Sequence, residues 1–175
     1  IKEKNIAYRN LYQGDYFQTG NVRINVLWPE REWVRRQIQS SDLASATAGE
    51  AVLGLETNGQ LNDFSYYLHL EYKDFDALFT GDGDLRIQPK IMATVDLPDI
   101  ELLKFPHHGS KTGILAAFLD RIKPEATVIS SGKNPWGHPT DEALKLLRDR
   151  DIEILRTDTE GEIKIVSDGK NWQIK

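Results

Sequence analysis

Hydrophobic and polar positions follow, along most of the chain, the two periods that strands and helices impose. Val22–Trp28 alternates with a period of two, which predicts a half-buried strand, and Pro29 ends it. Residues 30–39 then place Trp33 and Val34 on one face, which is typical of an amphipathic helix. Residues 2–20 are expected to form a short strand and a turn that lead into Val22, so this part of the chain predicts two strands followed by a helix.

The middle of the chain predicts a hairpin. Residues 64–72 alternate between apolar and more polar positions, so we expect a strand with one buried face that carries Tyr66, Leu68, Leu70 and Tyr72. Residues 73–76 are expected to turn the chain into a second strand at 77–80. Before the hairpin, the small and polar residues 40–49 predict a mobile loop, and 51–60 predicts a short strand and a turn.

Strands and helices alternate in the second half of the chain. An irregular helical segment, interrupted by Pro89, is expected after the hairpin. Apolar runs predict further strands at 100–105, 126–131, 152–155, 162–166 and 171–174, and helical spacing predicts helices at 113–122 and after an N-cap at Thr140. This order predicts an α/β fold with α+β character, in which helices flank a mixed β-sheet.

Composition limits the class of protein without naming a function. The 175 residues are 39% hydrophobic, which is enough for one domain with a core. The sequence contains no apolar run of about 18 residues, so it predicts no transmembrane helix, and no signal peptide pattern is visible. The chain begins at Ile1 rather than Met, so we expect a piece of a longer polypeptide, and the compartment stays open.

Charge and cysteine content narrow the chemistry. The net charge of −5 argues against a surface that coats nucleic acid, but it permits an enzyme that holds phosphodiesters through a metal ion. The chain has no cysteine, so histidine and carboxylate are the strong ligands that remain for a metal.

Chemically versatile residues follow three neighbouring predicted strands. Asp82 comes after an apolar run, His107 and His108 come after the next, and His138 follows the third. Because ligands bind outside the carboxyl ends of strands in α/β sheets, we expect these side chains to share one rim. Lys111 lies in the Gly-Ser turn after the histidine pair, which is expected to open a helix. Its ammonium and the N–H groups of that helix would favour a phosphate.

Each of these residues also has a structural interpretation. The histidine pair could form a tight turn with exposed rings, and Asp82 could cap a helix. His138 could help to cap the helix that follows it. His69, in the middle of a predicted strand, is expected to be a packed or surface residue. Trp136 could form a wall of an active site.

Four segments carry a resemblance to a known family. They are Leu78-Phe79-Thr80-Gly81-Asp82, Leu103-Lys104-Phe105-Pro106-His107-His108-Gly109-Ser110, Gly137-His138-Pro139-Thr140 and Arg156-Thr157-Asp158. Together they resemble the metallo-β-lactamase-fold hydrolases, in particular the branch found at the C-terminus of the ComEC-type DNA-uptake channel. Asn62-Asp63-Phe64-Ser65 is similar to the Asn-Asn-x-Ser entry to that branch's central hairpin, and Asp63 is a departure from it.

The resemblance implies that residues 1–175 are one domain corresponding to the second half of a metallo-β-lactamase αββα sandwich. The first half, with its His-x-His-x-Asp-His loop, is absent from this sequence. The complete domain would bind two divalent metals, zinc or manganese, and this chain would hold an incomplete site. Asp82 matches the carboxylate that bridges the metals, and His108 matches the ligand of the second metal, although His107 and His108 could be interchanged. His107, His138 and Lys111 would contact substrate or steady developing charge.

The function implied by this resemblance is part of a metal-dependent phosphodiesterase or nuclease in a DNA-uptake channel, acting on single-stranded DNA or another phosphodiester. The isolated chain is expected to be inactive without the N-terminal half of the domain, and the longer protein would be membrane-associated if it is of ComEC type. One alternative is a soluble hydrolase of the same fold that acts on a small phosphoester, thioester or lactone. Another is a non-catalytic assembly module that self-associates through an exposed sheet edge.

Overall fold

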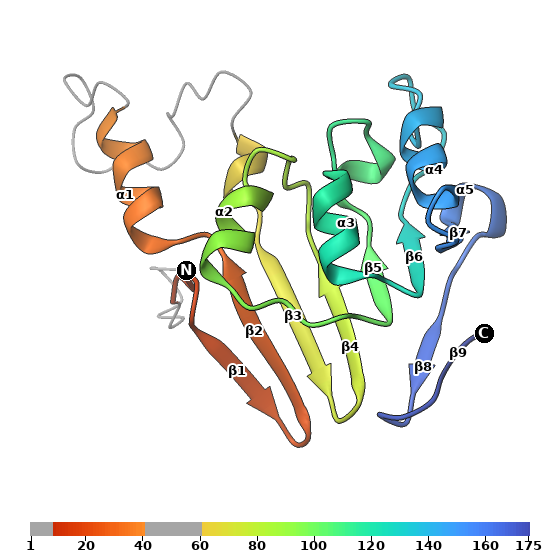
Figure 1. The fold of residues 1–175 in the computed structure, drawn as a ribbon, viewed down its shortest axis with the longest axis horizontal. Helices are drawn as coiled ribbons and strands as arrows, with labels where there is room; N and C mark the ends of the chain where they lie inside the picture. The colour runs from red at the N-terminus through yellow and green to blue at the C-terminus, as the bar shows by residue number, and fades with distance from the viewer. Residues whose placement is uncertain (1–8, 41–60) are drawn as a thin grey trace, which may run out of the picture.

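A computed structural model of the chain describes residues 9–40 and 61–175 (Figure 1). The main sheet contains β1 (Tyr16–Thr19), β2 (Val22–Trp28), β3 (Tyr67–Tyr72), β4 (Phe75–Phe79), β5 (Leu102–Lys104), β6 (Ala126–Ile129) and β7 (Glu153–Arg156). A separate hairpin contains β8 (Ile165–Ser167) and β9 (Trp172–Ile174). The helices are α1 (Arg31–Ser40), α2 (Gln88–Thr94), α3 (Ala116–Ile122), α4 (Asp141–Arg148) and α5 (Thr157–Glu160), with 3₁₀ turns η3 (Leu61–Phe64) and η4 (Pro106–Gly109).

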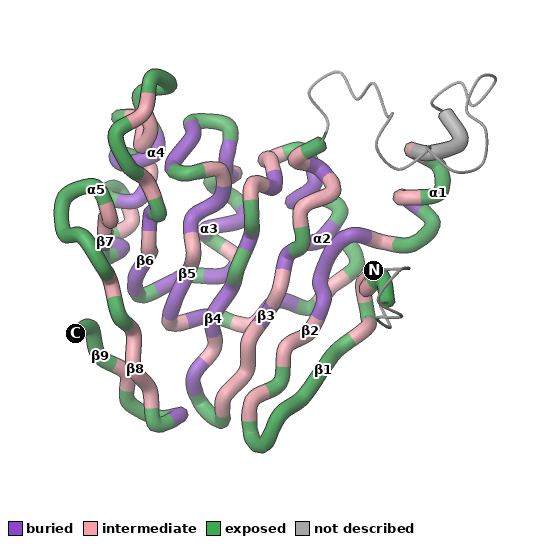
Figure 2. The backbone as a smooth tube through the Cα atoms, turned by 180° about the vertical axis from the view of Figure 1, so that it is seen from behind, coloured by how far each residue is buried: buried purple, intermediate pink, exposed green. Residues whose placement is uncertain are grey.

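The seven strands of the main sheet lie side by side in chain order. Neighbours from β1 to β4 are antiparallel, whereas β4, β5, β6 and β7 are parallel. Parallel neighbours need a crossover connection, and α2, α3 and α4 supply the three crossovers. These helices cover one face of the sheet, and the view from behind shows the other face without them (Figures 1 and 2). The predicted mixed sheet flanked by helices is confirmed.

The buried face of β3 differs from the prediction. Tyr67 and His69 are buried, whereas Leu68 and Leu70, on the opposite face, are only partly buried. Tyr66, also predicted to be buried, lies before the strand and is 41% exposed. The reason is that the helices cover the Tyr67 face, where the Tyr67 ring packs edge-on against Phe118 of α3 at 6.1 Å between ring centroids. Alternation alone could not choose between two faces that both carry large side chains.

Some helix boundaries also differ from those predicted from the sequence. Pro89 lies in the first turn of α2 and begins the helix rather than interrupting it, because proline lacks an N–H that the first turn does not need. The helix predicted for 113–122 begins at Ala116, because the Leu115 N–H donates to the side chain of Gln88. The predicted N-cap is confirmed, since Thr140 Oγ1 accepts from the Ala143 N–H.

The remaining differences are local. The turn predicted for 156–161 contains the short helix α5. Ser40, the first residue of the loop predicted for 40–49, is the last residue of α1. The rest of that loop, and the strand and turn predicted for 51–60, lie outside the described residues.

Two apolar clusters hold the sheet. The larger one lies between the sheet and the helices and includes Trp28, Leu103 and Phe118. The smaller one, which includes Phe75 and Leu155 among its buried residues, lies against the β8–β9 hairpin. Within residues 9–40 and 61–175 no helix is both long and apolar enough to cross a membrane.

Candidate functional site

The ends of three parallel strands bring the predicted residues into one cleft. Asp82 follows β4, His107 and His108 lie in η4 directly after β5, and His138 is in the loop after β6. All four line a cleft of about 470 Å³, together with residues such as Trp136. The four side chains therefore lie at one rim, as expected from their positions after the strands, while their chemical roles stay a prediction.

Asp82 and His108 form a pair of candidate metal ligands in the cleft. His108 Nε2 lies 3.5 Å from Asp82 Oδ1, and both side chains are about half exposed. The other ring nitrogen, Nδ1, lies 2.7 Å from the carbonyl oxygen of Ser130 and so donates its proton there. In a neutral ring this bond leaves the lone pair on Nε2, facing Asp82. Two ligands of one tetrahedral zinc lie about 3.4 Å apart, which this pair matches.

His107 and His138 stack beside this pair. Their ring centroids are 5.6 Å apart and the rings are inclined by 19°. The Nδ1 atom of each ring is buried and has no hydrogen-bond partner within the described residues. Partial burial lowers the pKa of His138 from its usual value, and the neighbouring His107 and His108 lower it further. An imidazole nitrogen without a hydrogen-bond partner can accept a metal or a proton, and a buried polar atom without a partner is costly enough to need an explanation.

The backbone of the histidine pair is strained. His107 has φ 48° and ψ 45°, and His108 has φ 55° and ψ 23°, so both adopt the left-handed conformation. This conformation costs a residue other than glycine about 1–2 kcal/mol. A hydrogen bond from the His107 N–H to the Gly81 carbonyl, 3.2 Å, holds the turn against the end of β4. A strained backbone persists only where the surrounding structure holds it in place. Such residues cluster at functional sites, where the strained geometry serves the mechanism rather than stability.

Asn134 organises the third loop of the cleft and was not predicted. Its amide nitrogen donates to the carbonyl oxygens of His138 at 2.6 Å and Gly132 at 2.8 Å. Its amide oxygen accepts from the backbone N–H groups of Trp136 at 3.1 Å and His138 at 3.0 Å. One side chain therefore closes the loop that carries Trp136 and His138. The Asn134-Pro135 dipeptide, a turn signal, could have indicated this role.

Lys111 and Lys104 differ in their position relative to the cleft. Lys111, predicted to contact phosphate, is exposed in the turn after η4 and does not line the cleft as the described residues form it, so its role stays a prediction. Lys104, at the end of β5, was not singled out from the sequence. Burial lowers the pKa of Lys104, and the charge of Asp82 partly opposes that shift. Lys104 is therefore close enough to interact electrostatically with Asp82, the predicted metal ligand.

Comparison with known proteins gives three relatives. The chain is 29% identical to ComE operon protein 3 of Bacillus subtilis over 164 residues, which cover 93% of this chain and 18% of that protein. It is 30% identical to Recombination protein 2 of Haemophilus influenzae over 90 residues, covering 51% of this chain and 11% of the relative. It is 38% identical to Competence protein ComA of Neisseria gonorrhoeae over 65 residues, covering 37% and 9% respectively. No protein-family model matches the chain.

The names of these three relatives refer to the ComE operon, to recombination and to competence, and the chain is similar to a part of each protein. The match to the Bacillus subtilis protein runs through almost the whole chain, so it includes the segments that form the cleft. The chain spans less than a fifth of the length of each of these relatives.

Proposed function

We propose that the cleft is part of a metal-dependent phosphodiesterase site in a DNA-uptake protein, and that its substrate is single-stranded DNA. The observation that carries the proposal is the pair formed by Asp82 and His108, whose ligand atoms lie 3.5 Å apart at the carboxyl ends of neighbouring parallel strands. The similarity to competence proteins supports DNA as the substrate class.

The residues present fit one part of a metal site. Asp82 and His108 would hold a divalent metal, zinc or manganese, and the carboxylate could also face a second metal whose other ligands come from the other half of the domain. Such a metal supplies Lewis-acid polarisation of a phosphoryl oxygen. The Ser130 carbonyl orients the His108 ring by accepting its Nδ1 proton. His107 and His138 place their imidazole rings beside the pair, where they would hydrogen-bond a phosphate oxygen or accept a proton.

A metal titration tests this proposal. Isothermal calorimetry with zinc and then manganese compares the chain with an Asp82→Ala, His108→Ala double variant. We expect the double variant to lose one equivalent of bound metal, because both ligands of the pair are gone. Asp99→Ala, which removes an exposed carboxylate paired with Lys123, serves as the control and should bind as the unchanged chain does. Equal binding by all three proteins contradicts the proposal.

The substrate class needs a separate assay. The full-length protein that contains this domain is incubated with manganese and either labelled single-stranded DNA or a panel of small phosphoesters, thioesters and lactones. Cleavage of DNA alone supports the proposed substrate. Hydrolysis confined to the panel supports the alternative of a small-ester hydrolase.

Trp136 supplies a prediction about DNA binding. The residue is 76% exposed and lines the cleft, and its backbone N–H is fixed by Asn134. Stacking of a base on an aromatic ring contributes about 1–3 kcal/mol, so Trp136→Ala should weaken binding of a thymidine oligonucleotide roughly tenfold. Fluorescence anisotropy of the labelled oligonucleotide, recorded in a buffer that contains calcium, measures the affinity. Trp136→Phe should retain most of the binding, and an abasic oligonucleotide should not distinguish the variants. Equal losses on thymidine and abasic DNA would argue against stacking.

A further inference from the structure

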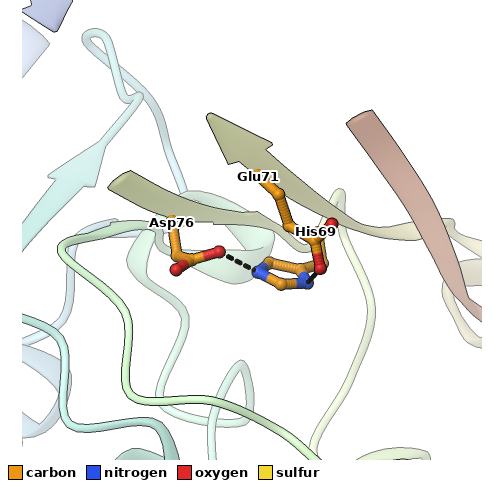
Figure 3. A group of neighbouring side chains, drawn as sticks. All are labelled: His69, Glu71 and Asp76. Carbon is orange, nitrogen blue, oxygen red and sulfur yellow. Dashed lines mark hydrogen bonds and ion pairs between the residues drawn. The ribbon is translucent and has the colours of Figure 1, made fainter. Parts of the chain in front are cut away.

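A second group of metal-ligand residues lies away from the cleft. His69 and Glu71 belong to β3, and Asp76 belongs to β4. The three side chains converge on the face of the sheet that the helices cover (Figure 3). They lie near the turn between β3 and β4, at the opposite end of β4 from Asp82. The hairpin register creates the group, because it pairs Glu71 directly with Asp76.

The imidazole of His69 lies between two carboxylates. The residue is 6% exposed. Its Nε2 atom is 2.7 Å from Asp76 Oδ1 and donates a hydrogen bond to it. Its Nδ1 atom is 3.6 Å from Glu71 Oε1, which is beyond hydrogen-bonding range. One nitrogen is therefore hydrogen-bonded to a carboxylate, while the other faces a second carboxylate at ion-pair distance (Figure 3).

This arrangement matches the way proteins build histidine ligands. A histidine that binds a metal usually donates its other ring N–H to a carboxylate, which fixes the ring and makes it a stronger ligand. Asp76 would play that part for His69. Two ligands of one zinc lie about 3.4 Å apart, close to the 3.6 Å between His69 Nδ1 and Glu71 Oε1. One ligand atom from each of the three residues lies within 4.8 Å of the others.

The surroundings leave room for further ligands. The group borders a cavity of about 780 Å³, also lined by Asn25 and Asp96, so water could complete the coordination. The nearby cations do not occupy the ligand atoms. Arg23 approaches the other oxygen of Glu71, Oε2, at 4.0 Å. Lys73 donates to the Asp168 carbonyl in the turn between β8 and β9.

We propose that this group binds a divalent transition metal, with zinc as the favoured occupant. His69 Nδ1 and Glu71 are the ligands, and Asp76 positions the imidazole. A metal here joins His69 and Glu71 of β3, and Asp76 of β4 holds the His69 ring in place. The metal therefore stabilises the β3–β4 hairpin, which Asp82 follows in the chain. The site does not depend on the proposed function, because it shares no residue with the cleft.

Zinc titration of four proteins separates the two sites. They are the unchanged chain, His69→Gln, the Asp82→Ala, His108→Ala double variant, and the combination of all three substitutions. We expect His69→Gln to lose one equivalent of zinc that the double variant keeps. At a zinc concentration about 100 times Kd, the midpoint of thermal unfolding should rise by roughly 5–10 °C through this site. That rise should persist in the double variant and vanish in His69→Gln.

A conservative variant keeps the test valid if His69→Gln does not fold. Glu71→Gln preserves side-chain size at a partly exposed position and should weaken zinc binding at least tenfold. Asp76→Asn should weaken it about 10–100-fold, as expected for a residue that orients a ligand. Magnesium in place of zinc should give no thermal shift, because imidazole suits zinc better. The proposal is overturned if His69→Gln and Glu71→Gln bind zinc with the same stoichiometry and affinity as the unchanged chain.

Discussion

Replacement of Gly109 by alanine should lower the free energy of unfolding by about 3 kcal/mol, the largest loss we expect from so small a change. A Cβ atom at this position would lie 2.4 Å from Pro139 Cβ and 2.8 Å from Pro139 Cα. Gly109 also has φ +88°, which is unfavourable for alanine by about 1–2 kcal/mol. The close approach is fixed by a hydrogen bond of 2.9 Å from the Thr140 N–H to the Gly109 carbonyl.

Gly137→Ala is the matched control. Gly137 has φ +70°, but a Cβ there would meet nothing within 4 Å, so only the conformational cost of about 1–2 kcal/mol remains. Denaturant unfolding followed by tryptophan fluorescence measures both variants. Gly109→Ala should also weaken metal binding, because Gly109 directly follows His108, one of the two proposed ligands. Equal loss of stability in the two variants would show that the contact with Pro139 is not tight.

Replacement of Gln88 by leucine should also cost about 3 kcal/mol. Gln88 is fully buried, and its amide nitrogen donates to Tyr67 Oη at 3.0 Å and to the Gly113 carbonyl at 2.7 Å. Its amide oxygen accepts from the Leu115 N–H at 2.8 Å. Leucine fills a similar volume but leaves buried polar groups without a partner, at about 1–3 kcal/mol for each. The loss combines several such penalties, partly relieved by local relaxation.

Tyr67→Phe is the control for Gln88→Leu. It removes the hydroxyl that Gln88 contacts but leaves the bonds of Gln88 to Gly113 and Leu115 in place, so we expect a loss of about 1 kcal/mol. Denaturant unfolding of both single variants and of the double variant gives the coupling between the two side chains. If Gln88→Leu is no more destabilising than Tyr67→Phe, then the bonds to the segment before α3 contribute nothing, contrary to our expectation.

Local patterns in the sequence were sufficient for most elements of the fold. The strand at Val22–Trp28 and the cap at Thr140 were predicted correctly because both depend on neighbours in the chain. The predicted alternation of that strand ends at its last three residues, which are all buried where a bulge shifts the register. The start of α3 was misplaced because Gln88, a distant residue, binds the Leu115 N–H. The αββα sandwich and the two metals of the complete domain stay predictions.

The candidate site was predictable to the extent that it depends on strand ends. Asp82, His108 and His138 each follow a strand, and parallel strands deliver their carboxyl ends to one edge. The Ser130 carbonyl that orients His108 was not predictable, because a backbone oxygen has no signature in the sequence. The Asn134-Pro135 dipeptide signals a turn, but the partners of the Asn134 side chain are decided only when the loop after β6 closes on itself.

The sequence by itself determined the kinds of residue available and the elements that carry them: histidine and carboxylate without cysteine, placed after apolar strands. Tertiary structure decided which of these residues meet. Packing of α3 against the Tyr67 face placed His69 on the buried side of β3, and the hairpin register then brought Asp76 beside it. The physical reason is that periodicity fixes only the alternation of side chains between two faces. The choice of face and of partner depends on what packs there, and those residues are distant in the chain.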